Sequence, residues 1–454
     1  MANLITIFGS TGNLMYKKLF PALTALGKQG HLDEKTKILC IGRADFDTDS
    51  YIKDAKEQLG KLDISPIESF IIYVKMDITN LDDYNKIKDY IQKNGKTLDH
   101  IFYLATPPDL FPTIAKGVSQ AKLIEKGDES SRIVFEKPFG EDLKSAHAIN
   151  KELWEYFDES QIYRIDHYLG KEMIQNILVM RFANRVFENN WSNEAIKSIS
   201  IIAKEEETVM SRGNYYDKVG ALKDMVQSHL MQMAALTLMN EPESFDANGI
   251  RAEKVKVLEQ LKVDKKDIVL GQYEGYLDEK NIPKSSNTET FVFFKATVDN
   301  HRWKNVPIYF LTGKNLDDKR SEIIIEFKSN THSKKLWDTH LPHNKLIIKV
   351  SPEEGIYFQL NVKSAGLTDE INPVPLDYCH NCNILTNSPE AYERLLLDLV
   401  NKNATLFTRW DEIETSWKII DEIKKYDQKC YVYKNYKDIV KTIKAVTKEA
   451  LYDL

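Results

Sequence analysis

The strongest constraint on the fold is an alternation of short apolar runs with amphipathic stretches over the first third of the chain. The runs are nearly continuous in Ile, Val, Leu, Phe or Tyr, which is typical of strands covered on both faces. They span residues 4–8, 38–42, 70–76, 100–106, 133–136 and 162–165, and helical segments such as 14–28 and 142–156 fit between them. Strand and helix in alternation predict a doubly wound parallel α/β sheet.

The pattern changes after about residue 166. Helical segments flank a strand-like stretch at 196–203, and a long helix is predicted over 222–239. Short polar connections then join β-like segments at 290–298, 306–312, 322–327, 345–350 and 357–362, and helices return from 391. Because no crossover helices separate these segments, they predict a large, mainly antiparallel sheet. We therefore expect two domains, an α/β domain over 1–165 and a β+α domain over 166–454.

Composition excludes several classes of protein. With 62 Lys and Arg against 68 Asp and Glu, the net charge of −6 argues against general nucleic-acid binding. No apolar run approaches the ~18 residues of a membrane span, and the N-terminus lacks the features of a signal peptide. Four cysteines in 454 residues exclude a disulfide scaffold and favour a cytoplasmic protein. Cys379 and Cys382 have metal-like spacing without a second pair, so we interpret them as incidental thiols.

A glycine-containing turn follows the first predicted strand. Its residues are Gly9, Ser10, Thr11, Gly12, Asn13 and Leu14. Glycines at this place allow the backbone to approach a pyrophosphate, and the following helix presents free N–H groups. The G-x-x-G spacing is also compatible with a tight structural turn. Its position at the first strand of an alternating pattern favours a nucleotide site.

The end of the second strand carries charges of both signs. Arg43 stands directly beyond the strand and Asp45 follows two residues later. An acid at this place usually holds the ribose hydroxyls of NAD, whereas a base accommodates the 2′-phosphate of NADP. Lys18, on the first turns of the first helix, adds positive charge. Surface charges at a strand end are the alternative interpretation.

The segment 164–172 lies at the junction of the two halves. If a helix begins at Asp166, then His167 and Lys171 share one face and Tyr168 lies beside it. Two cationic donors and a hydroxyl suit a phosphate dianion, and Asp166 is directed elsewhere to orient another group. An exposed helical charge pair is the alternative.

Three further positions are candidates for chemistry. His229 lies on the apolar stripe of its helix, as either a core histidine or a general base oriented by a carboxylate. Lys137 stands in a Glu-Lys-Pro turn at the end of the fifth strand, where open α/β sheets bind ligands, and Pro138 is a candidate for a cis bond. Lys314 and Lys319 follow a strand of the second sheet, with solvated lysines as the alternative.

Taken together, these segments resemble the glucose-6-phosphate dehydrogenase family. The resemblance rests on RIDHYLGKEMIQNILVMRFAN, FEKPFG, the Gly-x-x-Gly-x-Leu loop, TGKNL, IRAEKVKVL, GQY, TETFVFFKATVDNHRW, AYERLLLDLVNKNATLF and WKIIDEI. It runs in order from about residue 4 to about residue 425. It implies a Rossmann-like NADP-binding domain, a β+α domain for substrate binding and oligomerisation, and a homodimer or homotetramer.

The resemblance also implies a reaction and residue roles. Glucose 6-phosphate is oxidised at C1 to 6-phosphoglucono-δ-lactone while NADP is reduced, the first step of the oxidative pentose phosphate pathway. His229 matches the general base, Asp166 the carboxylate that orients it, and Lys137 a lysine near both sugar and nicotinamide. His167, Tyr168 and Lys171 match the phosphate site, Glu205 and Asp224 the acids that hold sugar hydroxyls, and Lys314 and Lys319 basic positions of the same pocket. No metal is expected.

Departures from the family pattern leave alternatives open. Asn13 replaces the usual Asp, Ser228 the usual Asn, and Lys223 a common Arg. The stretch 205–212 lacks its usual glycines. Because Asp45 accompanies Arg43, NADP is the first choice and use of NAD is the alternative. A dehydrogenase of another sugar phosphate and a non-catalytic nucleotide-binding regulator are the competing functions, and the presence of His229 with its partner residues argues against the regulator.

Overall fold

The computed structural model describes residues 2–95, 98–329, 341–379, 390–426 and 429–449. The chain forms two compact units. The first contains Met1–Gly170, Ser244–Arg251 and Pro389–Glu414, and the second contains Lys171–Glu243, Ala252–Ser388 and Thr415–Leu454.

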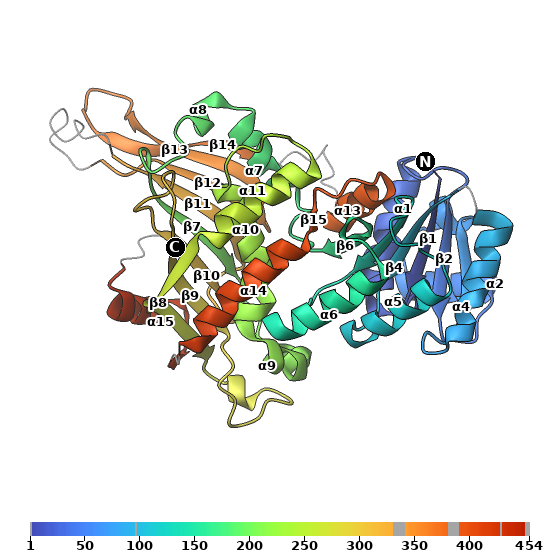
Figure 1. Ribbon diagram of the computed structural model, residues 1–454. Helices are drawn as coiled ribbons and strands as arrows, with labels where there is room; N and C mark the ends of the chain where they lie inside the picture. Colours follow the sequence, from blue (N-terminus) through green and yellow to red (C-terminus); the bar gives the residue numbers. More distant parts are fainter. Residues whose placement is uncertain (1, 96–97, 330–340, 380–389, 427–428, 450–454) are drawn as a thin grey trace. The chain divides into compact units, whose positions relative to one another are not determined.

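The first unit is built on a seven-stranded sheet in the order β15-β6-β5-β4-β1-β2-β3 (Figure 1). Its strands are β1 (Asn3–Phe8), β2 (Lys37–Gly42), β3 (Ile71–Lys75), β4 (Asp99–Leu104), β5 (Ser131–Phe135), β6 (Ile162–Ile165) and β15 (Phe407–Thr408). All pairs are parallel except that of β15 with β6. The predicted doubly wound sheet is confirmed, and the six strands predicted in this part of the sequence each match one of β1 to β6.

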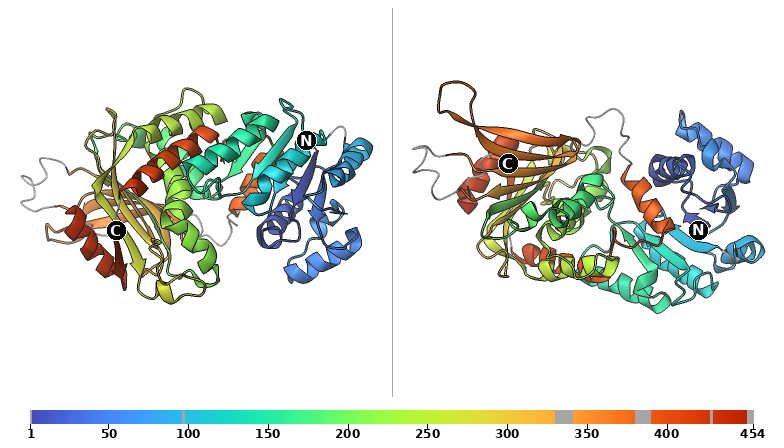
Figure 2. Two further views of the ribbon diagram at one scale, coloured as in Figure 1. Left: turned by 60° about the horizontal axis from the view of Figure 1, so that its bottom comes forward. Right: turned by 90° about the horizontal axis from the view of Figure 1, so that it is seen from above.

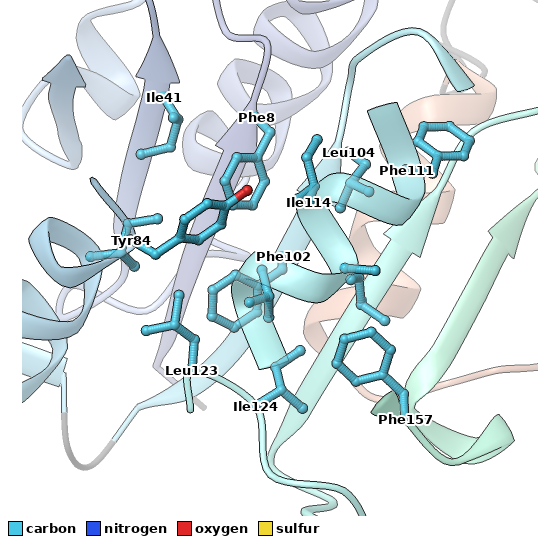
Figure 3. Close-up of a cluster of buried hydrophobic side chains, with 14 of the residues drawn as sticks. Phe8, Ile41, Tyr84, Phe102, Leu104, Phe111, Ile114, Leu123, Ile124 and Phe157 are labelled. Carbon is cyan, nitrogen blue, oxygen red and sulfur yellow. The ribbon is translucent and has the colours of Figure 1, made fainter. Parts of the chain in front are cut away.

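Helices connect these strands. They are the π-helical segment η1 (Met15–Leu19), α1 (Phe20–Lys28), α2 (Thr48–Leu59), α3 (Ser65–Glu68), α4 (Tyr84–Tyr90), α5 (Phe111–Gln120) and α6 (Leu143–Tyr156). Figure 3 shows how side chains from the strands and helices meet, with Phe8, Phe102, Ile114 and Phe157 in one cluster. Each fully buried side chain of this kind contributes about 1.5–3 kcal/mol, so this apolar cluster provides a firm base for the loops at the strand ends.

The second unit contains a nine-stranded sheet in the order β14-β13-β12-β11-β7-β10-β9-β8-β16 (Figure 2). Its strands are β7 (Ile196–Lys204), β8 (Leu261–Tyr273), β9 (Phe291–Val298), β10 (Ile308–Gly313), β11 (Arg320–Phe327), β12 (Lys345–Ser351), β13 (Gly355–Lys363), β14 (Ile371–Cys379) and β16 (Cys430–Tyr433). Only the pairs β7–β10 and β8–β16 are parallel among these strands. The predicted, mainly antiparallel sheet is confirmed.

The remaining helices follow the predicted change of pattern. They are α7 (Glu172–Phe182), α8 (Arg185–Glu188), α9 (Gly213–Ala221), the π-helical segment η7 (Leu222–Leu230), α10 (Met231–Leu238), α11 (Ala247–Glu259), α13 (Ala391–Val400), α14 (Trp410–Lys425) and α15 (Tyr436–Thr447). Segment η7 packs on β7 and β10, and α15 packs on β8 and β16. None of the helices in the described residues is long and apolar enough to cross a membrane.

A sharp bend precedes η7. Gly220 has φ +67°, and a Cβ atom there would collide with the carboxylate of Glu289. That carboxylate accepts a hydrogen bond from the Leu222 N–H at 3.0 Å, and the Glu289 carbonyl accepts one from the Ala221 N–H at 3.0 Å. Burial raises the pKa of Glu289. The bend therefore depends on a glycine and on a buried acid that together hold the start of η7.

We expect Gly220→Ala to destabilise the protein by about 4 kcal/mol, because φ +67° with ψ 173° is a backbone conformation open almost only to glycine and because the added Cβ displaces Glu289 from its buried hydrogen bond. Gly60→Ala is the matched control, since Gly60 has φ +62° but no atom within 4 Å of the added Cβ. The control, with φ +62° and ψ −101°, should lose only the backbone strain, about 2 kcal/mol. Urea unfolding measures both, and equal losses would show that Glu289 does not matter to the bend.

Candidate active site

The predicted coenzyme residues of the first unit lie at one edge of its sheet. Parallel strands share a carboxyl edge, and ligands of open α/β sheets bind there. The residues that follow the strands at this edge are Gly9 after β1, Arg43 after β2, Lys137 after β5 and Asp166 after β6. The structure thus places residues separated by more than a hundred positions at the ends of strands of one sheet.

The loop after β1 requires glycine. Gly9 has φ +83°, and a Cβ atom there would lie 2.5 Å from the Ala105 carbonyl oxygen. Gly12 donates its N–H to the Gly9 carbonyl at 3.0 Å, which closes a tight turn before the helix that leads into η1. Thr11 and Asn13 are exposed on this turn. The loop therefore offers bare backbone and a helix N-terminus to an anion.

Hydrogen bonds of Ser10 hold the backbone of this loop in place. Its side chain is fully buried, and its hydroxyl and N–H both donate to the Ile41 carbonyl, at 3.0 Å each. The Tyr51 hydroxyl donates to the Ser10 carbonyl at 2.8 Å. Ser10 was predicted to contact the coenzyme. Its buried side chain stabilises the backbone conformation of the loop.

Charged side chains surround the end of β2. Arg43 is exposed. Hydrogen bonds from Thr79, with the charge of Arg43 as a smaller cause, lower the pKa of Asp77. Asp45 pairs with Lys75, the last residue of β3, at 2.8 Å. Lys18 lies in η1 as predicted and pairs with Glu390 at 3.7 Å.

A carboxylate–tyrosine cluster lies at the end of β5. The Tyr103 hydroxyl donates to Glu136 Oε1 at 2.5 Å, and the Tyr392 hydroxyl donates to the same oxygen at 3.1 Å. Burial raises the pKa of Glu136, and the nearby charge of Asp166 adds to this rise. The predicted cis bond between Lys137 and Pro138 is confirmed. Neither tyrosine was predicted, although Tyr392 lies in the family-like AYERLLLDL stretch, which was its only signal.

No helix begins at Asp166, so the condition for a shared face of His167 and Lys171 is not met. Asp166 is 3% exposed, and its Oδ1 accepts the Tyr168 N–H at 3.0 Å, an Asx-type turn that competes with helix formation. The chain turns through 167–170, and α7 begins only at Glu172 with Lys171 as its N-cap. His167 and Lys171 therefore do not share a helical face, and the shared-face argument for a phosphate site does not apply.

In the second unit, Glu205 and Lys314 form an ion pair. They meet because β7 and β10 are parallel neighbours, with Lys204 opposite Gly313 in the register, so the next residue of each strand lies at the same end. Lys314 is buried at 2% exposure, so it is not the solvated lysine of the alternative interpretation. Lys319 is exposed and pairs with Glu207 at 3.0 Å.

His229 lies in the π-helical part of the predicted 222–239 helix and is 1% exposed. Leu222, Met225 and Val226 are buried beside it, as expected of its apolar stripe. Asp224 precedes His229 by five residues, about one π-helical turn, so the two project more nearly to one side than in an α-helix. Segments of this kind occur frequently at functional sites.

Asp224 and Lys314 both face Tyr216. The Lys314 ammonium lies 5.2 Å from the centre of the Tyr216 ring. Burial, with the charge of Asp224 as the next cause, raises the pKa of Tyr216 well above its usual value. The charges of Glu205, Asp224 and Lys314 therefore all act on one buried ring, a mixture of acidic and basic groups of the kind that sugar hydroxyls can bind. Tyr216 was not predicted.

The structure contradicts the interpretation of Cys379 as an incidental thiol. Cys40 and Cys430 are free thiols, whereas Cys379 is disulfide-bonded. The Cys379–Cys382 motif continues through 380–382, which lie outside the described residues.

Comparisons with known proteins agree with this arrangement. The model described as "Glucose-6-phosphate dehydrogenase, NAD binding domain" matches residues 6–176, and the corresponding C-terminal domain model matches residues 178–450. Glucose-6-phosphate 1-dehydrogenase of Bacillus subtilis (strain 168) is 40% identical over 444 residues, which cover 92% of this chain and 90% of that protein. The enzyme of the same name from Dickeya dadantii (strain 3937) is 37% identical, with 92% of this chain and 90% of that protein covered.

Solved structures show the same similarity. A glucose-6-phosphate dehydrogenase in complex with its substrate glucose-6-phosphate superimposes with a TM-score of 0.91 at 32% identity, covering 99% of this chain and 98% of that chain. Glucose-6-phosphate 1-dehydrogenase from Mycobacterium avium gives a TM-score of 0.85 at 31% identity, covering 95% of this chain and 94% of that chain.

Proposed function

Because the chain belongs to the glucose-6-phosphate dehydrogenase family, we propose that it oxidises glucose 6-phosphate at C1 to 6-phosphoglucono-δ-lactone with NADP as the preferred coenzyme. The observation that carries the proposal is the set of residues at the carboxyl edge of the first sheet, where a glycine loop, Arg43 and Lys137 follow three strands. This is the edge at which dinucleotides bind in such sheets.

The residues of this edge suit a dinucleotide. A Cβ atom at Gly9 would collide with the Ala105 carbonyl, so only glycine allows this compact loop, and the helix that follows presents its N-terminus. Gly12, Thr11, Asn13 and Leu14 would hold the pyrophosphate, and Lys18 and Arg43 would add positive charge. When bound, the oxidised nicotinamide supplies the electrophile that accepts the hydride.

His229 is the general base of the proposal. Hydride leaves C1 only as the C1 hydroxyl loses its proton, so a basic group must reach that oxygen. An imidazole is suited to this task near neutral pH. Asp166 would orient the imidazole and stabilise the imidazolium that forms. The burial of both side chains supports these roles, because a fixed, dry environment strengthens such electrostatic effects.

The remaining residues would bind the sugar phosphate. His167, Tyr168 and Lys171 would hold the phosphate, Glu205 and Asp224 the sugar hydroxyls, and Lys137 both sugar and nicotinamide. Lys314 would hold Glu205 in position through their ion pair, and Lys319 would add positive charge. Phosphate binding remote from C1 orients the sugar and so converts binding energy into rate.

The choice of coenzyme can be tested at Arg43. Arg43→Ala should lower kcat/KM for NADP about ten- to hundredfold and leave that for NAD nearly unchanged, because only NADP carries the 2′-phosphate that a guanidinium can clamp. Steady-state kinetics with both coenzymes measures this. Arg185→Ala, at an exposed arginine of α8, is the control. Equal losses with NAD and NADP would show that Arg43 does not read the 2′-phosphate.

The activity itself is tested by following coenzyme reduction with glucose 6-phosphate, galactose 6-phosphate and free glucose. Preference for glucose 6-phosphate supports the proposal, and preference for another sugar phosphate would replace its substrate. No reduction with any sugar would favour a nucleotide-binding regulator.

We also propose that residues 1–165 form the coenzyme domain and residues 166–454 the substrate-binding domain of a cytoplasmic homodimer or homotetramer. The two family models, which divide the chain near residue 177, support the division. The free thiols of Cys40 and Cys430 support the location. Val374, Leu376 and Tyr378 are 39%, 59% and 56% exposed on β14, the outermost strand of the second sheet, which supports an interface there. Sedimentation that detects only monomer would contradict the oligomer.

A further inference from the structure

Lys75 stands beside the end of β2, where the coenzyme residues begin. It is the last residue of β3 and lies opposite Gly42, the last residue of β2, in the parallel register. The Met76 N–H donates to the Gly42 carbonyl at 2.9 Å, which continues the pairing past the strand ends. A cation from β3 therefore lies next to the segment that carries Arg43 and Asp45.

The backbone of that segment is held firmly. The Tyr73 hydroxyl donates to the Ala44 carbonyl at 2.9 Å, and the Tyr73 ring stacks on Tyr51 with a centroid distance of 4.7 Å. Tyr51 in turn donates to the carbonyl of Ser10 in the glycine loop. One aromatic pair thus supports both the glycine loop and the residues after β2, so Arg43, Asp45 and Lys75 have defined places relative to the loop.

Lys75 is paired but remains accessible. Its ammonium lies 2.8 Å from Asp45 Oδ1, and the side chains are 53% and 90% exposed. An ion pair this exposed contributes about 0–1 kcal/mol, so an incoming anion can replace the carboxylate at little cost. The neighbouring Asp77 accepts hydrogen bonds from the Thr79 N–H at 3.0 Å and the Thr79 hydroxyl at 2.8 Å, and its pKa is lowered. Asp77 is therefore held as an anion by Thr79. Asp45 is the carboxylate with which Lys75 forms its ion pair.

We propose that Lys75 is a coenzyme-specificity residue: it binds the 2′-phosphate of NADP together with Arg43, and it shields that phosphate from Asp45. With NAD, Lys75 stays on Asp45, and the carboxylate accepts a hydrogen bond from the ribose hydroxyl. The basic residues at this place would then favour NADP, and the acidic Asp45 would favour NAD. The inference rests on the proposed use of NADP.

Binding of adenosine 2′,5′-bisphosphate and adenosine 5′-monophosphate, measured by calorimetry on the full chain, tests this without turnover. Lys75→Ala should weaken the bisphosphate about tenfold or more and leave the monophosphate unchanged, because one charge-assisted contact to the 2′-phosphate is lost. Lys56→Ala is the matched control, since Lys56 is an equally exposed lysine paired with Glu68 at 2.8 Å in the same unit. It should change neither affinity.

The Asp45→Asn variant separates the two roles proposed for Lys75, direct contact with the 2′-phosphate and shielding of that phosphate from Asp45. Asp45→Asn should strengthen the bisphosphate, and adding Lys75→Ala to it should still weaken that ligand about tenfold. If Lys75→Ala leaves the ratio of the two affinities unchanged, or loses its effect in the Asp45→Asn background, the inference is overturned. A wild-type protein that binds both probes equally overturns it as well. Absence of glucose 6-phosphate oxidation, with these binding effects intact, would remove only the proposed function.

Discussion

Replacing His229 with asparagine is expected to lower kcat about 10⁴-fold, the upper range for a positioned general base, while glucose 6-phosphate still binds with unchanged affinity. Asparagine has a similar size and can fill the buried position without accepting a proton from the C1 hydroxyl. Because the lost interaction is made only in the transition state, kcat and kcat/KM should fall together. Steady-state kinetics measures kcat, and equilibrium binding of glucose 6-phosphate measures the affinity separately.

The same substitution at His301, an exposed histidine, is the control and should leave kcat unchanged. Thermal unfolding of both variants checks that the buried site tolerates the change. If the His229 variant keeps a kcat near that of the wild type, another group removes the proton. If its affinity for the sugar phosphate falls with kcat, His229 belongs to binding and the assignment of the base fails.

The elements that were predictable from the sequence are those whose side chains are buried on a regular period. Strands β1 to β6 are covered on both faces, so each appears as a nearly continuous apolar run. Strand β8 was missed because the run Asp264–Asp267 interrupts its pattern at a register shift between Val263 and Ile268. Strand β14 was missed because it is an exposed edge strand that contains Pro373 and Pro375.

The local conformation of the candidate site could not be predicted from the sequence. The family resemblance proposes roles for Asp166 and His229, but periodicity could not show the conformation around them. The Asx-type turn at Asp166 depends on one hydrogen bond, and the π-helical segment 222–230 directly follows the bend at Gly220. The carboxylate–tyrosine cluster joins Tyr103, Glu136 and Tyr392, which are brought together only by the return of the chain to the first unit. Contacts of this range leave no periodic signal in a sequence.

Lys171→Ala is expected to raise KM for glucose 6-phosphate about ten- to hundredfold with a smaller change in kcat, because a charged contact to the phosphate dianion is removed. Lys171 is the N-cap of α7 and is half-buried, and partial burial strengthens an electrostatic contact relative to bulk water. Backbone hydrogen bonds from the Leu169 and Gly170 N–H groups close the turn that precedes it, and the fold should therefore survive the truncation.

Free glucose provides the internal control for this variant, because it has no phosphate for Lys171 to hold. Its kcat/KM should be unchanged in Lys171→Ala, so the preference for the phosphorylated sugar should fall by the same factor by which KM rises. Lys262→Ala, at an exposed lysine of β8 paired with Asp299, should change neither sugar. A parallel loss with both sugars would point to a disturbed active site, and an unchanged KM for glucose 6-phosphate would remove Lys171 from the phosphate site. Only a loss confined to the phosphorylated sugar is consistent with a lysine that anchors the ester end of the substrate and leaves the chemistry at C1 to other groups.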